Sequence, residues 1–300
     1  MLPPKHTPYD RGAIPFSIGL KPLDLDNWLD VDQHLQRYLD EKERLETAYP
    51  DRVFAAETGT AAAQAEVLEL IVEHLSRHHT GTHRRDGNTM RIRQRAVALS
   101  GDVPALQRAA HLVQEDLVLM RRNNDGSGWR IAAASLCFPS SWNLRDKFSK
   151  ALADVHAPVP GFARGSRNAT IIDRIFDGLQ VAIPVYRFNW SIYGDDDLHH
   201  SARGSGQNDQ LDALQRTLRV EVQTLRKLAV SGDILFTIRI HTDPVSALTA
   251  HPDKANVCAG FIKALDRLDD AQLRYKALDE QKRRAMVHAL HQIASGEHAS

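Results

Sequence analysis

Cysteine is scarce in this chain: only Cys137 and Cys258 occur among 300 residues, too few for a disulfide scaffold or a cysteine-rich metal site. An excess of charge is also missing, since 38 basic side chains balance 38 acidic ones, which argues against a nucleic-acid or membrane-surface partner. No run approaches the ~18 apolar residues of a membrane span, and the first residues, MLPPKHTPYDRGAIPF, lack the apolar segment of a secretion signal. We therefore expect a cytoplasmic protein that binds neither nucleic acid nor membrane.

The residues that are present describe a globular protein with 42% apolar residues. That length and composition predict one large domain or two smaller ones with a sizeable core. The 15 histidines are the unusual feature, and they justify a search for metal ligands.

Apolar periodicity predicts helices toward both ends of the chain and strands in its middle. After a Pro-rich arm over residues 1–22, helical spacing covers 25–39, 61–76, 143–153, 167–179, 255–268 and 272–293, and strands cover 116–122, 129–138, 186–193, 217–225 and 233–242. This order indicates an α+β fold without βαβ alternation. Residues 76–95, which hold six arginines, three histidines and one acid, predict a solvated loop or a contact surface for an anionic partner.

Each of the last three predicted strands carries one apolar row and one polar row, because side chains alternate along a strand. The polar rows are Arg187, Asn189 and Ser191; Arg219, Glu221 and Gln223; and Thr237, Arg239 and His241. A half-solvated antiparallel sheet gives the same alternation. The alternative is a pocket for a polar or anionic ligand, which the absence of lysine and the directional donors favour.

Among the histidines, His156 stands out because it directly precedes Ala-Pro-Val-Pro-Gly. A rigid proline frame fixes the direction of the ring, which suits a single axial metal ligand, although a structural role is the alternative. His74 and His78 stand four residues apart, which is the spacing of two zinc ligands on a helix. The glutamate that catalyses in such zinc sites is missing between them. His200 lies in a polar stretch that predicts a solvated loop. Cys137 predicts a core residue, with a thiolate haem ligand as the alternative.

Several longer strings together resemble one family, the α-subunit-like haem-dependent oxidative N-demethylases. They run in family order over about residues 14–250 and are PFSIGLKPLD (15–24), VQEDLVLM (113–120), ASLCFPSSWNLRDKF (134–148), HAPVPGF (156–162), YRFNWS (186–191) and RVEVQTLRKLAVSGDILFTIRIHTDP (219–244). The chain departs from the family pattern at Val222, where the family has arginine.

The resemblance implies a PAS-like antiparallel sheet that holds haem b, within a single domain over residues 1–300. Its core is expected over about 96–250, with the N-terminal arm and helices in 1–95 and C-terminal helices in 251–300. It implies that dioxygen oxidises an N-methyl group of a small secondary amine such as dimethylamine, giving formaldehyde and a primary amine. NADPH, FMN and an iron–sulfur cluster are expected only on a separate reductase subunit.

The resemblance also gives the candidate residues their roles. His156 is the expected iron ligand, and Arg187 and Arg219 are expected to bind the haem propionates, with Gln223 orienting the ligand. The catalytic candidates are Glu221, which would hold the ammonium group of the substrate, and Arg239, Arg219 and Asn189. The alternative function is a non-catalytic haem-binding PAS-like sensor or a partner-binding module, because a fold does not fix a function.

Overall fold

The computed structural model describes residues 2–10, 16–126, 128–202, 208 and 210–297. In these ranges a seven-stranded antiparallel sheet runs in the order β1-β8-β9-β10-β6-β7-β2, and a three-stranded sheet runs β3-β4-β5. The strands of the large sheet are β1 (Lys21–Pro22), β2 (Phe54–Ala56), β6 (Asp116–Arg122), β7 (Trp129–Ser135), β8 (Val185–Tyr193), β9 (Thr217–Lys227) and β10 (Ile234–Pro244). The fold is therefore α+β, as the order of elements predicted.

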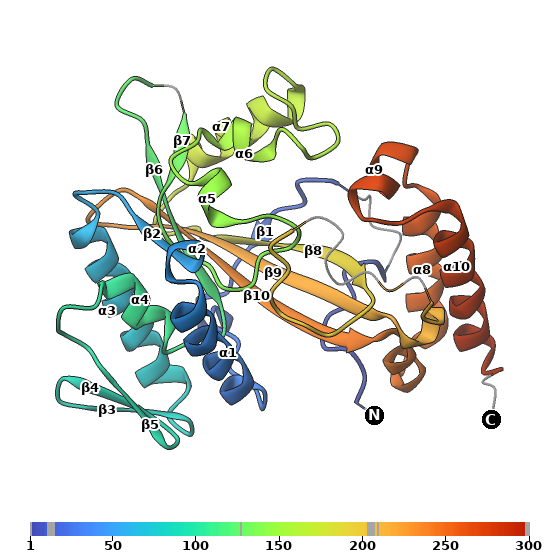
Figure 1. Cartoon of the computed structure of the whole chain (residues 1–300), viewed down its shortest axis with the longest axis horizontal. Coiled ribbons are helices and arrows are strands. Elements are labelled where there is room, and N and C mark those ends of the chain that lie inside the picture. The colour runs from blue at the N-terminus through green and yellow to red at the C-terminus, as the bar shows by residue number, and fades with distance from the viewer. Residues whose placement is uncertain (1, 11–15, 127, 203–207, 209, 298–300) are drawn as a thin grey trace.

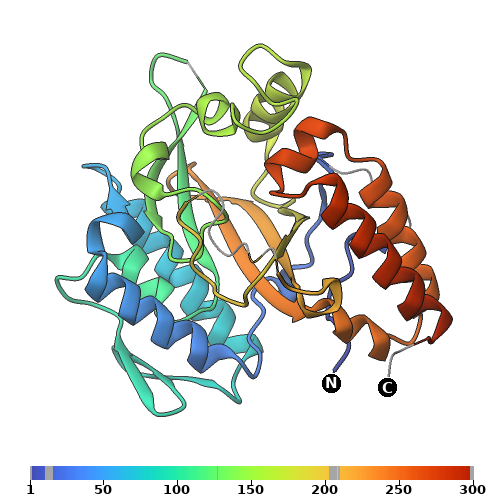
Figure 2. The same ribbon diagram turned by 45° about the vertical axis from the view of Figure 1, so that its right-hand side comes forward.

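Helices surround the large sheet on several sides, as Figures 1 and 2 show. They are α1 (Leu35–Ala48), α2 (Pro50–Val53), α3 (Ala61–His78), α4 (Ala105–Ala110), α5 (Leu144–Lys147), α6 (Leu152–His156), α7 (Arg167–Gly178), α8 (Lys254–Asp266), α9 (Asp270–Tyr275) and α10 (Glu280–Ser295), with short 3-10 segments at Leu25–Asn27, Ala213–Gln215 and Val245–Ala250. None of the helices in the described ranges combines the length and apolar content that crossing a bilayer requires.

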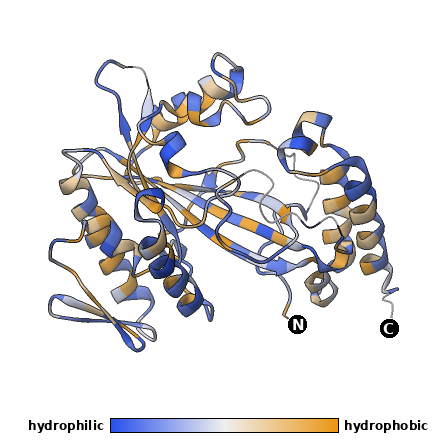
Figure 3. Ribbon diagram, in the orientation of Figure 1, coloured by the Kyte–Doolittle hydropathy of each residue, from blue (hydrophilic) through white to orange (hydrophobic). Residues whose placement is uncertain are grey.

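The two faces of the large sheet carry different chemistry, and Figure 3 shows hydrophilic and hydrophobic residues alternating along its long strands. We call the face that holds Arg187, Asn189, Glu221 and Gln223 the polar face. At its β6–β7 end it is covered by α5, α6 and α7, which pack against Val118 and neighbouring apolar residues.

We call the opposite side the arm face, because the N-terminal arm (residues 2–10) lies on it. Helices α3 and α4 cover Leu119 and Leu235 at one end of this face, and α8 and α10 cover Val220 at the other. The arm is held by Tyr9, which is fully buried and stacks on Phe261 with ring centroids 4.1 Å apart.

Several predicted elements differ from the observed ones in their bounds. The first helix begins at Leu35 rather than Leu25, since the backbone N–H groups of Asp30 and Asp32 donate instead to the side chains of Glu115 and Gln114, each at 3.0 Å. The stretch 143–153 forms two short helices rather than one, α5 and α6. The stretch 272–293 also forms parts of two helices, because Asp279 caps a new helix by accepting from the Lys282 N–H at 2.8 Å.

The prediction of a solvated loop for residues 76–95 is wrong. The segment forms most of the small sheet, made of β3 (His83–Asp86), β4 (Thr89–Ile92) and β5 (Arg95–Ala98). Met90 and Ile92 are almost fully buried against the α3–α4 side of the core. Met90 and Ile92 lie on either side of Arg91, and this alternation is typical of a strand. The many arginines around it obscured that pattern in the sequence.

Lys42 is a buried cation whose removal should destabilise the fold. Its Nζ donates to the carbonyl oxygens of Ala110 and Val113 at 2.9 Å and of Glu115 at 2.5 Å. Lys42→Met leaves these carbonyl groups without their donor, so the free energy of unfolding should fall by about 3–5 kcal/mol. Urea denaturation measures the change, and Lys150→Met at an exposed lysine should change it by no more than about 0.5 kcal/mol. A loss below about 1 kcal/mol for Lys42→Met would contradict the assignment.

His74 makes stability sensitive to acid. Burial, followed by the neighbouring charges of His78 and His79, lowers its pKa from 6.5 to about 4. The unfolded chain therefore binds more protons between pH 6.5 and 4, and the free energy of unfolding should fall as the pH falls through this window. We expect His74→Leu to make that dependence shallower in urea denaturation series, whereas His288→Leu at an exposed position should not.

Candidate functional site

The register between β8 and β9 brings two predicted polar rows together on the polar face. Arg187 lies opposite Gln223, Asn189 opposite Glu221, and Ser191 opposite Arg219. Residues opposite each other in an antiparallel pair have side chains on the same face. The prediction of a shared polar surface is therefore confirmed for these two strands.

Glu221 lies at the centre of this surface, with only 6% of the residue exposed. Its Oε2 accepts from the Gln223 Nε2 at 2.7 Å and from the Asn189 Nδ2 at 3.2 Å. Its Oε1 lies 3.9 Å from the Arg219 Nε. A carboxylate held mainly by neutral amides keeps acceptor capacity for a further cation or donor.

Arg187 provides a positive charge that no described side chain neutralises by contact. Its Nε is buried and has no hydrogen-bond partner. Burial lowers the pKa of its guanidinium, and the nearby charge of Glu221 opposes that shift. A buried unsatisfied donor is costly, so the guanidinium is suited to an anionic group that enters from outside the chain.

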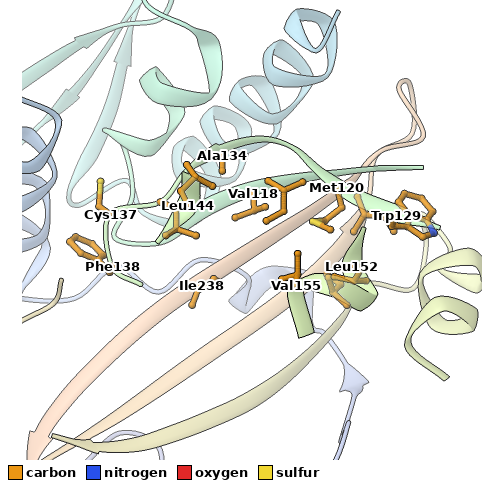
Figure 4. Close-up of a cluster of buried hydrophobic side chains, with 14 of the residues drawn as sticks. Val118, Met120, Trp129, Ala134, Cys137, Phe138, Leu144, Leu152, Val155 and Ile238 are labelled. Atoms are coloured by element: carbon orange, nitrogen blue, oxygen red, sulfur yellow. The ribbon is translucent and has the colours of Figure 1, made fainter. Parts of the chain in front are cut away.

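His156 ends α6, which is positioned by its own apolar side. Leu152 and Val155 of this helix point into the core cluster near Met120 and Ile238 (Figure 4). Burial, followed by the charges of Lys147 and Arg187, lowers the pKa of His156 to about 4, and a hydrogen bond to the Leu152 carbonyl opposes that shift. The imidazole is therefore neutral near pH 7, which is the form that binds a metal.

The chain that follows His156 turns as its prolines predict. The Val159 N–H donates to the His156 carbonyl at 2.8 Å, and the Phe162 N–H donates to the Val159 carbonyl at 3.0 Å. The His156 and Phe162 rings are 6.3 Å apart. This turn, together with the apolar contacts of α6, fixes the position of the helix end.

Lys276 lies beside β8 within electrostatic reach of Glu221 and Arg187, and the sequence did not single it out. It follows α9, its Nζ donates to the Trp190 carbonyl at 2.5 Å, and it lies 4.3 Å from the centroid of the Trp190 ring. Burial lowers its pKa to about 8, with Glu221 raising it and Arg187 lowering it. A lysine in a predicted C-terminal helix carries no sequence signal that it closes over a strand more than eighty residues earlier.

Arg219 lies on the polar face, but its hydrogen bonds are already made to the backbone. It is 1% exposed and donates to the carbonyl oxygens of Phe138 at 2.6 Å and Leu198 at 3.0 Å. These bonds hold two loop segments against β9. Only its Nε, which is buried without a partner, is directed at Glu221.

Arg239 does not join the polar rows, so the prediction of a third arginine at the same pocket is corrected. In the β9–β10 register Arg239 pairs with Val222, and Ile240 pairs with Glu221. Arg239 therefore lies on the arm face, where its Nε donates to the Asp30 carbonyl at 3.1 Å and its Nη2 donates to Asp32 at 2.6 Å. Its contacts anchor the segment before α1 rather than a ligand at Glu221.

His200 and Cys137, the other candidate metal ligands, have structural roles. His200 is 2% exposed, bonds Asp195 at 2.9 Å and stacks on Tyr193, so the solvated-loop prediction for it is wrong. Cys137 is buried in the core, and burial raises the pKa of its thiol well above the ordinary value. A thiol held protonated favours the core-residue interpretation over a thiolate ligand.

The residues of the polar face offer the two kinds of group that hold a haem, a neutral imidazole and a cation for a carboxylate. The Arg187 guanidinium has no described partner on this face and would suit an anionic group such as a propionate. His156 supplies a neutral ligand atom, and His156, Arg187, Asn189 and Gln223 each keep part of their surface exposed. Two surface hollows in the described part of the chain lie elsewhere, one around Asn123 at the β6–β7 turn and one beside α3.

A comparison with protein-family models identifies the family of the chain. The model described as "Haem-dependent oxidative N-demethylase, alpha subunit-like" matches residues 19–286, which include the sheet, α6 and α9. The match thus covers every residue assigned above to the polar face. The chain belongs to the haem-dependent oxidative N-demethylase, alpha subunit-like family.

Proposed function

We propose that this protein is the haem-b-binding catalytic subunit of a monooxygenase that demethylates a small secondary amine such as dimethylamine. The observation that carries the proposal is the position of the neutral His156 imidazole near the unpartnered Arg187 guanidinium, on the face that holds Glu221. These residues would supply a ligand for the haem iron, a cation for a propionate and a carboxylate for the substrate ammonium.

We further propose that residues 1–300 form one PAS-like haem domain. Its core would be residues 96–250, with helices of 1–95 and 251–300 added on both sides. The long antiparallel strands β8, β9 and β10 and the helices beside them support this interpretation. The interior-facing position of Lys276 also supports a single unit, because a C-terminal helix closes part of the site.

His156 and Arg187 are the residues that would hold the cofactor, by its iron and by a propionate respectively. When bound, haem supplies the activation of dioxygen that removes hydrogen from the N-methyl carbon. Glu221 would bind the substrate ammonium through Oε1, while Asn189 and Gln223 hold its other oxygen in place. The Lys276 Nζ, with a pKa of about 8, would hold a proton near neutral pH and exchange it with the site.

Electrons would come from a separate reductase subunit that carries NADPH, FMN and a [2Fe–2S] cluster. The family name describes an alpha subunit and so implies a complex with other subunits. We place the nicotinamide, flavin and iron–sulfur chemistry on that partner, and on this chain only the haem, the amine and dioxygen.

The experiment that tests this function uses the full chain reconstituted with haemin. An absorption spectrum should show a Soret band at one haem per chain. With NADPH, a flavin–ferredoxin reductase, oxygen and dimethylamine, the mixture should then release formaldehyde and methylamine in equal amounts. A haem spectrum without formaldehyde would favour the sensor function, and a chain that binds no haem would overturn both.

Arg187 offers a prediction for cofactor binding. Arg187→Gln keeps polarity but removes the charge that would pair with a propionate, so the haem dissociation constant should rise about 10-fold or more. Haem transfer to apomyoglobin measures the change. Arg37→Gln, at an arginine outside the site, should leave the transfer rate unchanged, and equal rates in both variants would contradict the role of Arg187.

A further inference from the structure

Three side chains that the proposed function does not use meet on the arm face. They are His6 from the N-terminal arm, Asp30 from the segment before α1, and His241 from β10. The Asp30 Oδ2 lies 3.3 Å from the His241 Nε2 and 3.8 Å from the His6 Nε2. Their potential ligand atoms all lie within 4.8 Å of one another.

Ion pairing with Asp30 holds this cluster together but leaves the His241 Nε2 without a well-directed hydrogen bond. His241 is 8% exposed, and its Nε2 is buried without a hydrogen-bond partner although it faces Asp30. A buried polar atom without a hydrogen bond is costly, and a bound metal ion would satisfy it. The His6 ring packs against Phe188 and His241, with centroids 5.2 and 4.7 Å away, and these contacts direct it toward the cluster.

The backbone of Asp30 is held on both sides. Its carbonyl accepts from the Arg239 Nε at 3.1 Å, and its N–H donates to the Glu115 Oε1 at 3.0 Å. Supporting bonds of this kind fix the direction of a metal ligand. Arg239, which the sequence placed at the polar face, thus has a positioning role here.

We propose that His6, Asp30 and His241 form a mononuclear site for a divalent transition-metal ion, Zn²⁺ or Fe²⁺, that fastens the N-terminal arm to the sheet. Two imidazoles and one carboxylate are a ligand set used for both ions. Ligands about 2.0–2.2 Å from a metal lie roughly 3–3.5 Å apart, so the observed separations require only a small contraction. The three ligands leave coordination positions for water.

Lys5 competes with a metal for the same carboxylate. Its Nζ lies 2.5 Å from the Asp30 Oδ1, and its side chain is 56% exposed. The ammonium therefore occupies the oxygen that does not face the histidines, and it can swing into solvent when an ion binds. This contact gives a specific prediction. If the cluster binds a metal, removing Lys5 should strengthen metal binding. If the three side chains only pack together, removing Lys5 should leave metal binding unchanged.

The test measures metal binding to the full chain, both with and without haem, by equilibrium dialysis with Zn²⁺ in air and Fe²⁺ under anaerobic conditions. Elemental analysis should find one zinc, or one iron beyond the haem iron, per chain. His6→Ala should weaken binding by about 100-fold or more, since even supporting residues of metal sites are worth 10- to 100-fold. His288→Ala, at an exposed histidine on α10, should leave it unchanged, and Lys5→Met should tighten it.

A second readout follows the arm itself. Trypsin cleavage between Lys5 and His6, followed by mass spectrometry, should slow on adding the metal and recover with EDTA. No metal above the haem iron, or equal binding by wild type and His6→Ala, would overturn the proposal. These outcomes are independent of formaldehyde release and of the Soret band, so the metal site and the proposed function can fail separately.

Discussion

Replacing His156 with glycine should remove the normal ligation of haem and nearly all demethylation. The variant loses the imidazole that we assign to the iron, which the turned segment after α6 holds in place. Because outer-shell partners of metal sites are already worth 10- to 100-fold, loss of the ligand itself should weaken haem binding by about 100-fold or more. The Soret band and haem stoichiometry after reconstitution measure the effect.

Imidazole added to His156→Gly provides the decisive control. A glycine leaves space at the end of α6, so free imidazole should restore a six-coordinate or five-coordinate histidine-like spectrum. His288→Gly would test for general damage, because His288 is an exposed histidine on another helix. A wild-type Soret band in His156→Gly without added imidazole would refute the assignment and direct attention to another ligand.

The sequence predicted the long strands well because their alternation is regular. Strands predicted over 186–193, 217–225 and 233–242 correspond to β8, β9 and β10 with changes of one or two residues at their ends. Alternation with a period of two residues is a local property of the sequence. It can therefore be read from the apolar residues of each strand without knowing the rest of the fold. The pairing of β8 with β9 places Asn189 opposite Glu221 and Arg187 opposite Gln223, so it brings the predicted polar rows of the two strands together.

The error at Arg239 shows what alternation leaves undetermined. A strand pattern says which residues share a face within one strand, but only the register says which rows of two strands share a face. In the observed register Arg239 pairs with Val222. The arginine of β10 therefore faces the arm, and its apolar row at Ile238 and Ile240 faces the polar side.

Lys276 and the His6–Asp30–His241 cluster could not be predicted for a different reason. Both depend on contacts between segments far apart in the chain, such as Lys276 with the Trp190 carbonyl. Neither lysine nor a single histidine carries a local signal of such a contact. The structure brings them together through the docking of terminal segments on the sheet, which composition and periodicity do not describe.

Glu221→Gln should raise the KM for dimethylamine by about 30-fold or more while haem binding is retained. The substitution preserves size and keeps one oxygen for the Asn189 amide, but it removes the negative charge that would attract an ammonium ion in a buried site. Truncating one member of a buried charge pair costs about 2–5 kcal/mol, which sets the expected range. Steady-state formaldehyde release measures the KM, and a Soret difference titration measures amine binding directly.

A structural role for Glu221 would give a different pattern, because its loss would also leave Arg187 and Lys276 without a nearby acid. The comparison that separates the two roles uses an uncharged ligand of the same shape, dimethyl ether. If Glu221 binds the ammonium, Glu221→Gln weakens the amine but leaves the ether unchanged. If it only balances the two cations, both ligands weaken together and the melting temperature falls. Glu57→Gln, which removes an acid paired with Arg130 at 2.7 Å outside the site, should affect neither ligand.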